Sequence, residues 1–195
     1  MKHEVTPASV ELDRESSPLS RIGRRAVPVV LGALLVAMSA QVVVPVPLSP
    51  VPMTLQPLAV LVVGGLLGAG AGASALVLYI ALGALGLPVF AGGGSGALHL
   101  VGPTGGYLLA FPVAAGLTGA VVGRAPRSVL RVLLASALGM VVIHVGGVAQ
   151  LALLGGDPTA AFRMGFLPFL TGDLLKVGLA AAVILAVGPR LRSLP

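Results

Sequence analysis

The chain contains 195 residues, of which 56% are hydrophobic and 9% are charged, and its formal net charge is +6. This composition excludes an ordinary soluble domain, and the basic residues stand at the ends of apolar segments, which argues against a nucleic-acid-binding surface. No cysteine is present, so disulfides, thiolate metal sites and a cysteine nucleophile are excluded.

Six apolar segments predict an all-α membrane protein with six transmembrane helices. A helix needs roughly 20 apolar residues to cross the hydrocarbon core, and no Asp, Glu, Lys or Arg occurs from Ala26 to Gly123. Residues 1–22 are polar and mixed in charge, as expected of a disordered cytoplasmic tail, and residues 23–195 are expected to form one domain. The expected membrane segments, separated by stretches rich in Pro and Gly, are residues 26–44, 55–68, 72–87, 106–123, 129–154 and 166–187.

The basic residues predict that both termini are cytoplasmic. In this orientation Arg163 is the single basic residue of an outer loop, in agreement with the positive-inside rule. The first and third connections are then long, uncharged outer loops, which contain "PVPLSPVPMTLQPLAV" and "LPVFAGGGSGALHLVGPTGGY". Irregular backbone at membrane depth needs protein or a cavity to satisfy its polar groups. We therefore expect these loops to fold over a ligand pocket that is open to the outside.

Asp173 and Lys176 are the only charged residues of the run "MGFLPFLTGDLLKVGLAAAVILAV", residues 164–187. An isolated charge at the bilayer centre costs about 2.5–3.5 kcal/mol on insertion scales, whereas residues at i and i+3 share a helix face and can pair. One interpretation is an ion pair that only orients the helix. The favoured interpretation is a site for a polar, partly anionic small molecule, because ionisable residues within a membrane segment mark functional sites.

Further candidate site residues lie in or beside the outer loops, and each has an alternative role. Thr54 and Gln56 can hydrogen-bond a ligand, or they can cap the second helix or satisfy polar groups of the loop backbone. Tyr107 can contact a ligand, or it can anchor its helix at the membrane interface. The glycines around Gly93 permit unusual backbone angles and a close approach to a ligand.

Neither a metal site nor another function class is favoured by the sequence. His99 and His144 have no second histidine or carboxylate at metal-ligand spacing, so structural histidines and no metal site are expected. An intramembrane serine protease with Ser95 and His144 is disfavoured, because Ser95 lies in a loop about ten residues before the next helix. A self-sufficient secondary transporter should show inverted repeats with broken helices or an ion relay, and the sequence contains no such repeat.

Three motifs occur in the outer loops in a specific order and spacing: "SPVPMTLQ", "GALGLPVFAGG" and "GPTGGY", followed by "TGDLLK" in the last segment. With these motifs, residues 26–188 resemble the BioY family, the biotin-specific substrate-binding (S) components of energy-coupling factor (ECF) transporters. The resemblance implies a six-helix S component that captures biotin from outside, without enzymatic activity or a cofactor. It also implies that Asp173 and Lys176 belong to the biotin site.

The resemblance further implies partners and a location. A transmembrane coupling subunit and two ATPase subunits would drive transport in the plasma membrane of a prokaryote, and the chain itself contains no G-x-x-x-x-G-K-[ST] phosphate loop. Ala33 and Ala37 lie one turn apart and form a small-residue stripe that permits close helix packing. This stripe resembles the alanine motif by which S components contact the coupling subunit.

The chemistry of biotin fits these residues. Its ureido ring carries two N–H donors and a carbonyl acceptor, its side chain ends in a carboxylate, and the remainder is apolar. A carboxylate such as Asp173 can accept from the ureido ring, and Lys176 can bind an anionic or carbonyl oxygen. Phe90 can pack on the apolar part of the ligand, in the manner of small-molecule sites.

Overall fold

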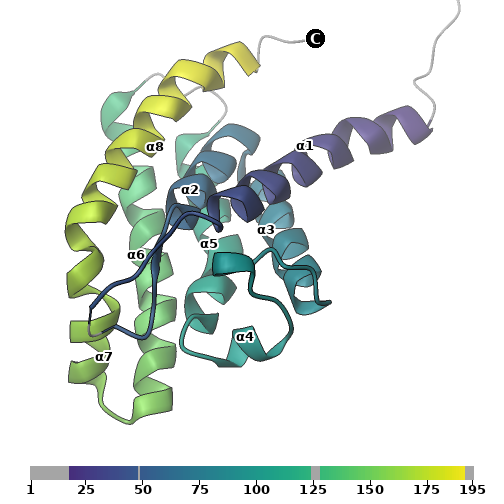
Figure 1. Cartoon of the computed structure of the whole chain (residues 1–195). Coiled ribbons are helices and arrows are strands. Elements are labelled where there is room, and N and C mark those ends of the chain that lie inside the picture. The colour runs from purple at the N-terminus through teal and green to yellow at the C-terminus, as the bar shows by residue number, and fades with distance from the viewer. Residues whose placement is uncertain (1–17, 48, 124–127, 192–195) are drawn as a thin grey trace, which may run out of the picture.

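The computed structural model describes residues 18–47, 49–123 and 128–191, and these residues form a helical bundle with one short hairpin (Figure 1). Most of the expected N-terminal tail, residues 1–17, lies outside the described residues. The α-helices are α1 (Pro18–Ser39), α2 (Gln56–Leu67), α3 (Ala69–Ala84), α4 (Leu98–Val101), α5 (Gly105–Val122), α6 (Val129–Gly155), α7 (Pro158–Gly165) and α8 (Leu170–Leu191). The remaining elements are strands β1 (Val43–Val44) and β2 (Met53–Thr54) and the 3-10 helices η2 (Ala91–Gly93) and η3 (Leu167–Phe169).

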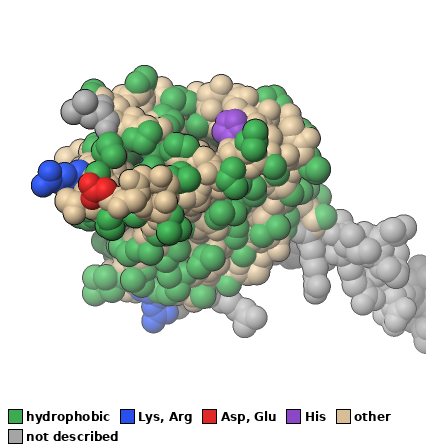
Figure 2. Space-filling model, turned by 90° about the horizontal axis from the view of Figure 1, so that it is seen from below, with side chains coloured by type: hydrophobic (Ala, Val, Ile, Leu, Met, Phe, Trp, Pro, Cys, Tyr) green, Lys and Arg blue, Asp and Glu red, His purple; other side chains and the backbone are tan. Residues whose placement is uncertain are grey.

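Helix lengths agree with a multi-pass membrane protein. Within the described residues, three stretches are long and apolar enough to cross a membrane: Gly105–Val122, Val129–Gly155 and Pro158–Arg190. The apolar helices Ala26–Ser39, Gln56–Leu67 and Ala69–Ala84 are shorter. Figure 2 shows the end of the bundle that is at the bottom of Figure 1, and charged side chains are few there. Along the sides of the long helices, large hydrophobic side chains such as Val113, Val141 and Leu175 are exposed. An apolar exterior of this kind matches a lipid environment.

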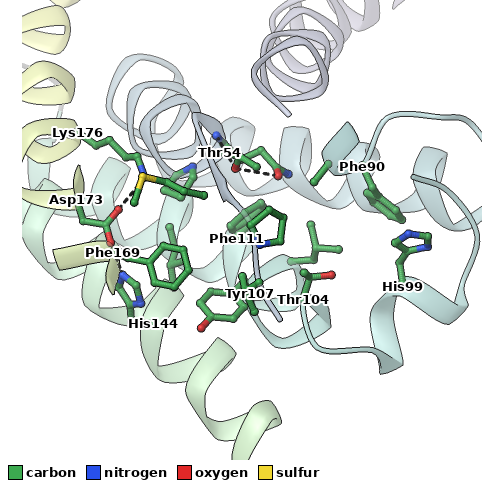
Figure 3. Close-up of a pocket in the computed structure, with 18 residues that line it drawn as sticks. Thr54, Phe90, His99, Thr104, Tyr107, Phe111, His144, Phe169, Asp173 and Lys176 are labelled. Carbon is green, nitrogen blue, oxygen red and sulfur yellow. Dashed lines mark hydrogen bonds and ion pairs between the residues drawn. The ribbon is translucent and has the colours of Figure 1, made fainter. Parts of the chain in front are cut away.

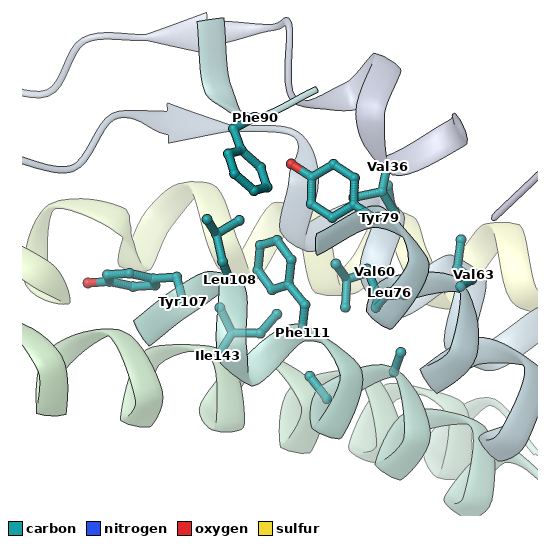
Figure 4. Packing of buried hydrophobic residues seen from close by; sticks show 14 of the residues in the cluster. Val36, Val60, Val63, Leu76, Tyr79, Phe90, Tyr107, Leu108, Phe111 and Ile143 are labelled. Carbon is teal, nitrogen blue, oxygen red and sulfur yellow. The ribbon is translucent and has the colours of Figure 1, made fainter. Parts of the chain in front are cut away.

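The helices pack around a core that lies where α2, α3, α5 and α6 meet. Val60, Leu76, Tyr79, Phe111 and Ile143 are all buried in this core (Figure 4). The helices approach closely because glycines face one another: a Cβ atom at Gly106 of α5 would collide with the backbone carbonyl of Gly146 in α6. This contact between small residues is typical of membrane helix bundles.

The first and third connections contain structure that the hydrophobic pattern did not predict. In the first connection β1 and β2 pair antiparallel, with Val43 opposite Thr54 and Val44 opposite Met53. The third connection contains η2 and α4, and it is joined to the first where the Gly92 amide donates to the Ala40 carbonyl at 3.2 Å. The two connections therefore form one layer at the same end of the bundle.

Helix α7 is also additional to the predicted elements. It begins at Pro158 after Asp157, whose carboxylate accepts from the backbone amides of Thr159 and Ala160 at 2.8 and 3.1 Å. An aspartate N-cap followed by proline is a strong start signal for a helix. The expected segment 166–187 is thereby preceded by a separate short helix, which packs against α6.

The stripe of Ala33 and Ala37 in α1 packs against the chain's own bundle, and its contact with a coupling subunit stays a prediction. Ala33 is only 2% exposed, and Ala37 packs against the same core from a partly buried position. Both residues therefore contact the chain's own bundle, because α1 uses its small residues to approach α2 and α3. Its outward face consists of larger side chains, Leu31, Leu34, Leu35 and Met38.

Candidate functional site

A cavity of about 260 Å³ lies between the helices and the layer formed by the first and third connections (Figure 3). This volume is slightly below the roughly 300–1,000 Å³ that is usual for small-ligand pockets. The connections contribute Val51, Pro52, Met53, Thr54, Phe90, Ala91, His99 and Thr104, and the helices contribute Gln56, Pro57, Tyr107, Leu108, Phe111, Ile143, His144, Phe169, Asp173 and Lys176.

Asp173 and Lys176 form a buried ion pair at one end of the cavity. Lys176 Nζ donates to Asp173 Oδ1 at 2.9 Å, and the two residues are 6% and 5% exposed, respectively. The predicted pairing on one face of the last helix is therefore confirmed. Both side chains also line the cavity, and their role as ligand contacts stays a prediction.

A third polar side chain, His144 of α6, completes this cluster. Its Nε2 lies 2.6 Å from Asp173 Oδ2, and the ring is buried against Tyr107, Phe166 and Phe169. The sequence interpretation of His144 as a satisfied structural histidine did not identify Asp173 as its partner. Residues 144 and 173 lie on different helices, and no local pattern in the sequence pairs them.

Thr54 and Gln56 take part in a hydrogen-bonded chain at the start of α2. The Thr54 hydroxyl donates to Gln56 Oε1 at 3.1 Å and accepts at 3.2 Å from the backbone amide of Gln56, the first residue of α2. Gln56 Nε2 donates to the Tyr79 hydroxyl at 2.7 Å, and this hydroxyl donates to the Val89 carbonyl at 3.0 Å. Both side chains line the cavity as well, and their hydrogen bonds to a ligand stay a prediction.

Tyr107 and Phe90 contribute aromatic surface to the cavity. The Tyr107 hydroxyl donates to the Gly165 carbonyl at 2.6 Å, and its ring is buried, so Tyr107 is not an exposed interfacial anchor. Phe90 is 1% exposed and packs edge-on against Tyr79 with ring centroids 5.7 Å apart. Gly93 has a positive φ of 80° and lies outside the cavity lining.

The hairpin closes the cavity near the charged cluster. A Cβ atom at Gly172, beside Asp173, would lie 3.1 Å from the Met53 sulfur, so β2 rests directly on α8. Met53 lines the cavity together with other apolar side chains, namely Leu108, Phe111, Ile143 and Phe169. The walls near Asp173 are therefore mostly apolar, and the Asp173 carboxylate is a polar group among them. Such a site suits a small, largely apolar molecule that carries hydrogen-bond donors.

The geometry does not support the serine protease alternative. Ser95 is not part of the cavity lining, whereas His144 is, and the Nε2 atom of His144 is bound to Asp173. A nucleophile and its base must lie within hydrogen-bond reach.

His99 lines the cavity and packs on Phe90, with ring centroids 5.6 Å apart.

Comparisons with known proteins agree with this architecture. The sequence pattern of the BioY family matches residues 10–193. A protein of Pyrococcus horikoshii named "Probable biotin transporter BioY" is 42% identical over 163 residues, which cover 83% of this chain and 95% of that protein. The "Biotin transporter BioY" of Thermotoga maritima is 40% identical over 140 residues, which cover 72% and 82% of the two chains.

A solved structure has the same fold. It is the crystal structure of the S-component for biotin from an ECF-type ABC transporter, with a TM-score of 0.80 and 24% sequence identity. The superposition covers 90% of this chain and 94% of that chain. The bundle with its two lining connections is therefore an S-component fold.

Proposed function

The chain belongs to the BioY family, and we propose that it is the membrane-embedded subunit that binds biotin for uptake by an ECF transporter. It is a transporter component and not an enzyme. The observation that carries the proposal is the cavity of about 260 Å³, in which mostly apolar walls surround the buried pair of Asp173 and Lys176. Biotin has the matching chemistry, because a polar ureido ring and a carboxylate flank an apolar centre.

We further propose roles for the individual residues. Asp173 accepts from the ureido N–H groups, because a carboxylate is the strongest acceptor in the cavity. Lys176 balances the charge of Asp173 and donates to an oxygen of the ligand. Thr54, Gln56, Phe90 and Tyr107 shape the remaining wall, and Gly93 gives the third connection the backbone angle that brings Phe90 over the cavity.

The wider assembly is part of the same proposal. Six membrane spans with both termini in the cytoplasm would place the first and third connections outside, where biotin is captured. A coupling subunit and two ATPases would supply the energy in the plasma membrane of a prokaryote, since this chain has no phosphate loop. The outward face of α1, which contains Leu31, Leu34 and Met38, is available for the coupling subunit.

Equilibrium binding of labelled biotin to the purified chain in detergent tests the proposal directly. We expect saturable binding of one biotin per chain, with competition by unlabelled biotin. Absence of binding at micromolar biotin, in protein that elutes as a single folded species, would overturn the assignment of biotin as the ligand.

A further inference from the structure

We propose that His144 is a positioning residue of the ligand site, which holds the Asp173 carboxylate in place as the neutral tautomer with the proton on Nε2. The inference rests on the proposed function, because it assigns a role toward the biotin-binding carboxylate. Figure 3 shows the three side chains of the cluster at one end of the cavity, with His144 and Lys176 on either side of Asp173.

The hydrogen-bond geometry determines the tautomer. A carboxylate has no donor when it is ionised, and Asp173 faces the Lys176 ammonium at 2.9 Å. The 2.6 Å contact between His144 Nε2 and Asp173 Oδ2 therefore needs the proton on Nε2. In a neutral ring the other nitrogen, Nδ1, then has no proton.

The surroundings of the ring favour its neutral form. Nδ1 is buried and has no hydrogen-bond partner among the described residues. The rings around it belong to Tyr107, Phe166 and Phe169, and the Tyr107 hydroxyl is already bound to Gly165. The charges of Asp173 and Lys176 balance each other, so a proton on Nδ1 would add an unbalanced charge to a buried site.

The role follows from the two-sided contact. Lys176 holds Oδ1 from the same helix, whereas His144 holds Oδ2 from α6, 29 residues away in sequence. Each carboxylate oxygen keeps a further acceptor position that can face the cavity. A carboxylate fixed in this way meets the ligand donors without reorganisation, which is how supporting contacts improve a binding site.

Three substitutions separate this role from simple packing. His144→Phe keeps an aromatic ring but removes the donor, and we expect biotin affinity to fall about tenfold, as for one lost charge-assisted hydrogen bond. His144→Gln carries an N–H at nearly the reach of Nε2 and should restore affinity to within about threefold. His144→Asn, whose amide is one methylene shorter, should not restore it. Ser136→Ala serves as the control. Ser136 is buried in the same helix, its hydroxyl has no partner within the described part of the chain, and it lies outside the cavity lining.

Affinity should be measured by calorimetry on detergent-solubilised protein, beside thermal unfolding without biotin. A packing role alone would lower the unfolding temperature and leave the affinity of the folded fraction equal in all four variants, and that result would overturn the proposal. Absence of biotin binding by the wild type would instead defeat the proposed function, and this inference with it.

A spectroscopic test does not require any variant to bind biotin. The chain contains three histidines, so ¹⁵N-histidine labelling and comparison with the His144→Gln spectrum identify the His144 ring. We expect one neutral ring with the proton on Nε2 at pH 7, before and after biotin is added. A doubly protonated ring, or a proton on Nδ1 alone, would overturn the proposal.

Discussion

The side-chain amide of Gln56 donates a 2.7 Å hydrogen bond to the hydroxyl of Tyr79, and this contact joins the start of α2 to α3. The same hydroxyl donates to the Val89 carbonyl in the third connection, while Gln56 Oε1 accepts from Thr54 of β2. One chain of hydrogen bonds therefore ties both connections that line the cavity to the helices below them.

Removing the hydroxyl at the centre of this chain should weaken the protein and the site together. In Tyr79→Phe, the Gln56 amide and the Val89 carbonyl each lose a buried partner, so we expect a loss of about 1–3 kcal/mol in unfolding free energy. Biotin affinity should also fall, because both lining connections lose an anchor. Thermal unfolding and biotin titration in the same detergent measure the two effects.

The control for Tyr79→Phe is Thr118→Val. Thr118 is fully buried, but its hydroxyl makes a long 3.4 Å contact with the Ala135 carbonyl, and the residue lies outside the cavity lining. The affinity of the Thr118→Val variant for biotin should equal that of the wild type. If Tyr79→Phe binds biotin as tightly as Thr118→Val, the hydrogen-bonded chain has no influence on the site.

The ion pair of α8 should be required for binding and not only for helix stability. Asp173→Asn removes the charge that Lys176 and His144 contact, so we expect a loss of biotin affinity of at least tenfold. The double variant Asp173→Leu with Lys176→Leu distinguishes the two roles. Replacing a buried ion pair by apolar residues is often neutral for stability, so this variant should fold but not bind biotin. Wild-type affinity in the double variant would show that the pair is structural.

Gly147 should tolerate no side chain. A Cβ atom there would overlap the ring of Tyr107, whose hydroxyl is bound to Gly165. We expect Gly147→Ala to cost about 1–3 kcal/mol, as for an overpacked core, and to weaken biotin binding by displacing Tyr107. Gly178→Ala is the matched control, since nothing lies within 4 Å of its Cβ position. Equal unfolding temperatures for the two variants would contradict the packing described here.

The orientation of α1 predicts opposite results for neighbouring residues. Ala33→Leu places a large side chain at a position that is 2% exposed, so the isolated chain should lose about 1–3 kcal/mol of stability. Leu34→Ala changes a residue that is 48% exposed and should leave the stability of the isolated chain nearly unchanged. Thermal unfolding without partner subunits tests both predictions. If Ala33→Leu is as stable as the wild type, Ala33 does not pack against the bundle and the alanine stripe is exposed.

Several properties of this protein follow from the sequence alone, because they depend on runs of neighbouring residues. The hydropathy of consecutive residues predicts the apolar helices, and stretches rich in Pro and Gly predict the connections between them. The spacing of Asp173 and Lys176 within one helix predicts their pairing, since i and i+3 share a face. The loop motifs indicate the family for the same reason, as they are continuous in the chain.

Only the tertiary structure decided the contacts between distant segments. His144 meets Asp173 across two helices, and Tyr79 meets Gln56 across another two. The inward orientation of Ala33 likewise depends on how α1 packs against α2 and α3. In a uniformly apolar helix, local hydropathy does not distinguish a face that meets lipid from one that meets protein, because both environments are apolar. The packing of small residues and a few buried hydrogen bonds determine which face of each helix meets protein. Both depend on the folded bundle, because they join segments that are distant in the sequence.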